Sequence, residues 1–199
     1  MVRLPLDDEL RAERHRLLAT LEALPGEAFE TGPTLCDGWS PRDVLGHLLG
    51  VDRAVTSYLW YGPCLGAANR AQVERARSLP RDRLMEKAAR WADRPSWTSR
   101  LGAMVVLGDL AVHHQDIVRG LGLERDVSAP VSTLILWDGA MLSCQTNLRI
   151  IRHRVVPTDG HPPIGCPSVP GVPEVRGTRE ALGLWLAGRD SVADELRFT

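Results

Sequence analysis

The sequence has no excess of charge of either sign, because 24 Lys and Arg residues stand against 25 Asp and Glu residues in a chain of 199. A nucleic-acid-binding protein usually carries a basic excess or a clustered basic stripe, so this balance argues against that class. No run approaches the roughly 18 apolar residues of a transmembrane helix, and residues 1–18 lack the apolar stretch of a secretory signal peptide. We therefore expect a cytoplasmic protein that binds neither nucleic acid nor membrane.

Several motif-defined classes are excluded by what the pattern lacks. Four cysteines (Cys36, Cys64, Cys144 and Cys166) lie far apart without a CxxC pair, so a zinc ribbon or finger is not expected and the thiols are expected to be reduced. No Glu follows His113 and no His stands four residues after it, so the HExxH pattern of zinc proteases is absent. The sequence also shows no P-loop and no Ser-His-Asp pattern.

What is present favours a mainly α protein. Apolar residues at three- and four-residue spacings predict a helix over 7–24, and a second begins at the N-cap Ser40 with Pro41 and Asp43 behind it. We predict three further helical regions: a polar one over 67–92 that Pro80 breaks, an apolar one over 98–119, and one that opens at Ser128 and Pro130. Four main helices with short connections are typical of a four-helix bundle.

The pattern changes after about residue 145. The run LRIIRHRVVPT is rich in β-branched residues, a Pro- and Gly-rich stretch follows, and one more helix is predicted between its cap Thr178 and Gly188. We therefore expect a helical bundle over residues 1–145 and a small α/β appendage over residues 146–199.

Three residues carry a possible chemistry: His47, Asp109 and His113. Asp109 and His113 are four residues apart, so they project from one helix face about 6 Å apart. With His47 from another helix they offer three nitrogen and oxygen ligands to a divalent metal, and three ligands leave positions open, as in catalytic sites. On spacing alone, a core histidine that donates to a backbone carbonyl is the commoner explanation, and it stays open at this point.

Three runs resemble the mycothiol-dependent maleylpyruvate isomerase family, which belongs to the DinB/YfiT-like superfamily of metal-binding four-helix bundles. They are PTLCDGWSPRDVLGHLLGVDRAV, DLAVHHQDIVRGLG and GVPEVRGTREALGLWLAGR. The runs stand in the order of the family's N-terminal signature, long-helix signature and C-terminal segment. The resemblance thus covers nearly the whole chain and implies a DinB-like bundle.

The resemblance also implies a ligand set and a thiol. The family's first metal histidine falls on His47, its acidic ligand on Asp109, where many relatives carry Glu, and its second histidine on His113. The implied metal is divalent; zinc is the expected ion, and nickel and ferrous iron are the alternatives. Family members use a low-molecular-weight thiol, mycothiol in actinobacteria, as cofactor or cosubstrate.

The expected activity follows from thiol chemistry. A metal lowers the pKa of a thiol, and the thiolate attacks an electrophilic carbon. If the adduct expels the thiol after bond rotation, the result is cis–trans isomerisation; if it does not, the result is an S-conjugate. We expect an isomerase or S-transferase, as monomer or homodimer, whose partners are a small-molecule substrate and the thiol. Two alternatives remain: a thiol-independent enzyme of specialised metabolism that performs a cyclisation or elimination, and a non-catalytic metal- or ligand-binding module.

Five further residues are candidates near such a site. Asp116 lies three residues after His113 and is placed to orient that imidazole as a hydrogen-bond acceptor. Trp39 stands at the start of the second helix and is a candidate for substrate contact. The basic cluster Arg149, Arg152 and His153 is a candidate for binding the carboxylates of a substrate or thiol. Packing would also explain Asp116 and Trp39, and a solvated strand edge would also explain the basic cluster.

Overall fold

A computed structural model describes residues 4–52, 65–167 and 170–199. The chain divides into two compact units, one up to Glu124 and one from Arg125 onward. Within the described residues, no helix is both long and apolar enough to cross a membrane.

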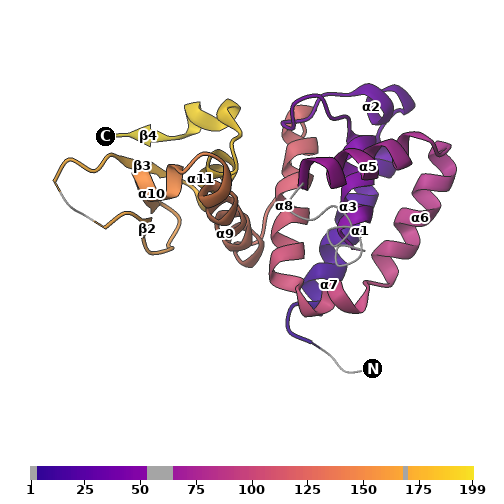
Figure 1. Ribbon diagram of the computed structural model, residues 1–199, viewed down its shortest axis with the longest axis horizontal. Coiled ribbons are helices and arrows are strands. Elements are labelled where there is room, and N and C mark those ends of the chain that lie inside the picture. The colour runs from indigo at the N-terminus through magenta and orange to yellow at the C-terminus, as the bar shows by residue number, and fades with distance from the viewer. Residues whose placement is uncertain (1–3, 53–64, 168–169) are drawn as a thin grey trace. The chain divides into compact units, whose positions relative to one another are not determined.

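The first unit is helical (Figure 1). Its elements are α1 (Asp7–Ala23), α2 (Gly26–Thr31), α3 (Pro41–Val51), α5 (Leu65–Arg77), α6 (Arg81–Asp93), α7 (Trp97–Leu101) and α8 (Ala103–Gly120). The predicted first helix and the helix pair around Pro80 are confirmed, and the short α2 was not predicted. The helix expected over 98–119 is wrong at its start, because Gly102 separates α7 from α8. The expected continuation of the second helix beyond Asp52 lies outside the described residues.

The start of α3 is fixed by the capping box that the sequence predicts. The Asp43 N–H donates to Oγ of Ser40, and the Ser40 N–H donates to Oδ2 of Asp43 over 3.1 Å. Arg77 of α5 donates two hydrogen bonds to the same carboxylate, over 2.8 and 2.7 Å. Burial raises the pKa of Asp43, but the bonds from Arg77 and Ser40 outweigh it, so this pKa lies below its usual value. These contacts position the helix that carries His47.

Two glycines on α3 allow α5 to approach closely. A Cβ on Gly46 would lie 2.4 Å from Cβ of Ala76, and a Cβ on Gly50 would lie 2.2 Å from Cδ of Gln72. Real Cβ atoms do not approach other atoms this closely, so a larger residue at position 46 would push α3 and α5 apart, and one at position 50 would displace the Gln72 side chain. The close approach places the side chain of Gln72 beside His47.

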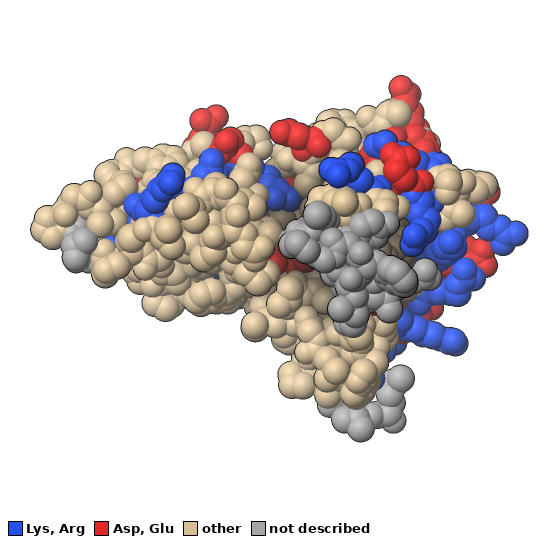
Figure 2. All heavy atoms as spheres, in the orientation of Figure 1, with Lys and Arg blue, Asp and Glu red and all other residues tan. Residues whose placement is uncertain are grey.

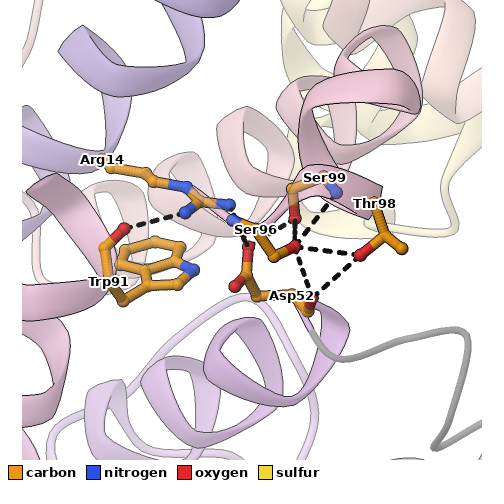
Figure 3. A network of polar contacts seen from close by, with 6 residues as sticks. All are labelled: Arg14, Asp52, Trp91, Ser96, Thr98 and Ser99. Carbon is orange, nitrogen blue, oxygen red and sulfur yellow. Dashed lines mark hydrogen bonds and ion pairs between the residues drawn. The ribbon is translucent and has the colours of Figure 1, made fainter. Parts of the chain in front are cut away.

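A buried ion pair connects α1 to the end of α3 (Figure 3). Arg14 is fully buried, and its Nη2 donates to Oδ1 of Asp52 over 2.6 Å. Its Nη1 donates to the Trp91 carbonyl over 2.8 Å, and its guanidinium lies over the Trp91 ring. The Asp52 carboxylate also accepts hydrogen bonds from Ser99 Oγ and from the Ser96 N–H. Burial lowers the pKa of Arg14, and the Asp52 carboxylate opposes this effect.

The second unit combines helices with a small sheet. Its elements are α9 (Ala129–Thr146), α10 (Arg149–Arg152), β1 (Arg154–Pro157), β2 (Ile164–Gly165), β3 (Glu174–Gly177), α11 (Arg179–Leu186), the 3-10 helix η1 (Asp190–Glu195) and β4 (Arg197–Phe198). The strand order is β2-β1-β3-β4, with β1 and β3 parallel and the other pairs antiparallel. The predicted helix starts are confirmed: Ser128 precedes α9, although its side chain makes no capping hydrogen bond, and the Thr178 side chain accepts from the Ala181 N–H at the start of α11.

The sequence predicted a boundary at residue 145, whereas the two units meet between Glu124 and Arg125. The sequence assigned the helix after Ser128 to the bundle, whereas α9 packs against α11 within the second unit. Gly139 and Gly183 make this contact close, since a Cβ on Gly139 would lie 2.0 Å from the Gly183 carbonyl oxygen. The first part of the β-branched run LRIIRHRVVPT is also helical, as α10, and its strand begins only at Arg154.

Candidate metal centre

The structure brings His47 of α3 together with Asp109 and His113 of α8. Oδ2 of Asp109 lies 3.6 Å from Nε2 of His47, and Oδ1 of Asp109 lies 3.6 Å from Nε2 of His113. One ligand atom of each residue lies within 4.8 Å of the others. Asp109 therefore reaches both imidazoles, although Asp is one methylene shorter than the Glu of many relatives.

These separations suit ligands of a single ion. A distance of 3.6 Å is too long for a hydrogen bond, whereas two ligands bound at about 2.1 Å to a tetrahedral ion lie roughly 3.4 Å apart. The His47 and His113 side chains are only 5% and 10% exposed, and that of Asp109 is 24% exposed. Asp109 is thus the most exposed of the three side chains.

The other nitrogen of each imidazole has an acceptor behind it. Nδ1 of His47 lies 3.2 Å from Oε1 of Gln72, and Nδ1 of His113 lies 2.9 Å from Oδ2 of Asp116. Amide and carboxylate oxygens only accept, so each Nδ1 donates to the oxygen behind it, and each Nε2 faces Asp109. This arrangement is typical of metal-binding histidines, whose N–H is held by a carboxylate or carbonyl.

Cys36 also belongs to this cluster. Its thiol donates to Oδ2 of Asp116 over 3.0 Å, and its Sγ lies 3.6 Å from Nδ1 of His113. The loop that carries Cys36 is fixed to α8, because the Leu35 N–H donates to the Asp116 carbonyl over 3.0 Å. Gly120 allows this, since a Cβ there would lie 2.4 Å from Cα of Thr34.

Trp39 lies beside both histidines. Its ring centroid is 6.0 Å from that of His113, with the planes 22° apart, and 5.3 Å from that of His47. Thr34 Oγ1 donates to the Trp39 carbonyl over 2.9 Å and so holds this part of the loop. The indole therefore forms an apolar wall next to the two imidazoles.

Sequence reasoning selects His47, Asp109, His113, Asp116 and Trp39, and the structure brings all five together. It does not select Gln72 or Cys36, because each reaches the cluster from a different element. The signal for Gln72 was the Gly46 and Gly50 spacing, which indicates a close helix contact. The signal for Cys36 was its position three residues before Trp39, in the same loop.

The basic cluster predicted to bind an acidic group lies in the second unit. Arg149 donates to the Trp185 carbonyl and to Oδ1 of Asp190, and its guanidinium lies over the Trp185 ring. Nδ1 of His153 lies 3.1 Å from the Arg149 carbonyl, and its ring meets that of Trp185 edge to face. Arg149 and His153 thus have structural contacts within their own unit, and Arg152 is exposed.

The comparisons with known proteins agree with this fold. Residues 10–94 match the family model of the mycothiol maleylpyruvate isomerase N-terminal domain, a range that includes His47 and ends before Asp109. No curated protein matches the sequence.

Two solved structures resemble the whole chain. The crystal structure of a histidine-to-alanine mutant of the mycothiol-dependent maleylpyruvate isomerase has a TM-score of 0.69 and 13% identity. The crystal structure of the mycothiol-dependent maleylpyruvate isomerase itself has a TM-score of 0.63 and 15% identity. Each covers 98% of this chain and 93% of the other. Residues 10–94 are therefore similar to the mycothiol maleylpyruvate isomerase N-terminal domain, and the whole chain shares its fold with the mycothiol-dependent maleylpyruvate isomerase.

Proposed function

We propose that this protein is a metal-dependent enzyme that uses a low-molecular-weight thiol, mycothiol, to isomerise or conjugate a small electrophilic metabolite. The observation that carries the proposal is the orientation of His47 and His113. Each Nδ1 is held from behind, and each Nε2 faces the Asp109 carboxylate at 3.6 Å. The family match and the shared fold support mycothiol as the thiol and isomerisation as the reaction class.

His47, Asp109 and His113 would hold the metal. When bound, a divalent metal lowers the pKa of a thiol that reaches it, which produces the nucleophilic thiolate near neutral pH. Gln72 and Asp116 fix the planes of the two imidazoles, and the Trp39 ring shields these imidazoles on one side. Zinc suits the nitrogen and oxygen donor set first, with nickel or ferrous iron as alternatives.

The direct test is thiol-dependent turnover. Purified protein is incubated with zinc and a panel of electrophilic alkenes, maleylpyruvate first, with and without mycothiol. We expect substrate loss only when mycothiol is present, with isomer or S-conjugate as product. Equal turnover without mycothiol would instead identify a thiol-independent enzyme. Zinc binding without turnover across the panel would identify a binding module. Either outcome contradicts the proposal.

Loss of the support behind His113 should weaken metal binding. Asp116→Asn keeps the shape of the side chain but removes the charge that accepts from Nδ1 of His113. We expect the zinc Kd to rise by about 10- to 100-fold, as for other residues that hold a metal ligand in place. Competition with a chromogenic chelator measures this Kd.

The matched control for this variant is Asp93→Asn, because Asp93 is an exposed residue of α6. Its zinc Kd should equal that of the wild type. Wild-type zinc affinity in Asp116→Asn would show that Asp116 does not support His113.

A further inference from the structure

A cavity of about 360 Å³ lies among α3, α5 and α6 of the first unit. This volume falls in the range of small-molecule sites, which is roughly 300–1,000 Å³. The candidate metal ligands do not line it. Part of its wall is apolar, formed by Leu49, Leu79, Leu84 and the Trp91 side chain.

The cavity wall carries an excess of positive charge. Arg75, Lys87, Arg90 and Arg94 line it. Within the part of the chain that the structure describes, only Arg90 of these four has an ion-pair partner, which is Glu86 at 2.7 Å. Among the described lining residues, Asp52 supplies the only carboxylate, and it is bound to Arg14 at 2.6 Å. Figure 2 shows Lys and Arg side chains gathered over the region where Figure 1 places α6.

We propose that this cavity binds a small organic anion. The charged group of the ligand, a carboxylate, sulfonate or phosphate, is held by Arg75, Lys87 and Arg94, and an apolar body packs against Trp91 and the leucines. The site is separate from the candidate metal centre, although Gln72 contacts both, because its Oε1 holds Nδ1 of His47.

The test uses two fluorescent probes of similar shape on the metal-free protein. Anilinonaphthalene sulfonate carries an anionic group, and phenylnaphthylamine lacks it. The cavity variant Arg75→Ala with Lys87→Ala removes one cation from α5 and one from α6, both from exposed side chains. The control variant Arg70→Ala with Arg83→Ala removes the same charge from the same two helices outside the cavity.

We expect wild type and control to bind the sulfonate with the same Kd, and the cavity variant to bind it about tenfold more weakly. Phenylnaphthylamine should bind all three proteins equally and more weakly than the sulfonate binds wild type. Three results would each overturn the proposal: no change in the cavity variant, an equal loss in the control, or equal affinity of wild type for both probes. Thermal unfolding of each variant confirms that it is folded, and the result does not depend on thiol turnover.

Discussion

Replacing His47 with alanine should remove both the bound metal and the thiol-dependent turnover. His47 supplies one of three ligand atoms, and its Nε2 faces Asp109 at 3.6 Å. With two ligands left, we expect bound zinc to fall below about a tenth of an equivalent in protein purified without a histidine tag. Turnover should fall by at least about 100-fold, because a catalytic metal contributes several kcal/mol to transition-state stabilisation.

The matched control is His15→Ala. His15 is a histidine of α1 whose side chain is 47% exposed and whose Nε2 pairs with Asp93. This variant should keep the zinc content and turnover of the wild type. If His47→Ala kept full thiol-dependent turnover while correctly folded, the proposed mechanism would be wrong.

Asp52→Ala should strongly destabilise the first unit. It leaves the Arg14 guanidinium fully buried without its ion-pair partner and removes the acceptor for Ser99. Breaking a buried pair by removing one partner typically costs about 3–5 kcal/mol. We expect a loss of this size in the free energy of unfolding, measured by urea denaturation with circular dichroism.

Two further variants separate the ion pair from other effects. Asp93→Ala removes an exposed carboxylate and should change the unfolding free energy by less than about 0.5 kcal/mol. The double variant Arg14→Met with Asp52→Leu removes both charges, so it should be less destabilised than Asp52→Ala alone. A loss of under about 1 kcal/mol in Asp52→Ala would contradict a structural role for the pair.

Local signals in the sequence predicted the elements that carry the candidate site. Ser40, Pro41 and Asp43 mark the start of α3 because a capping box needs those residue types at that spacing. The four-residue spacing of Asp109 and His113 places both on one face of α8, whatever the tertiary structure. The resemblance to a known family then joined these two helices, which spacing alone does not do.

What the sequence did not predict depends on contacts between distant elements. Gln72 reaches His47 only because Gly46 and Gly50 let α5 approach α3. Cys36 joins His113 and Asp116 only because its loop binds to α8. Likewise, α9 reads as one more bundle helix by its apolar pattern, and its packing on α11 depends on the facing glycines at 139 and 183.

The metal content of the tag-free wild-type protein shows whether His47, Asp109 and His113 hold a divalent ion. Elemental analysis after purification, repeated after incubation with zinc or nickel and removal of the excess, gives the ratio of metal to chain. We expect about one divalent ion per chain, held by His47, Asp109 and His113. A ratio below about a tenth that neither zinc nor nickel restores would contradict the metal centre and the mechanism built on it.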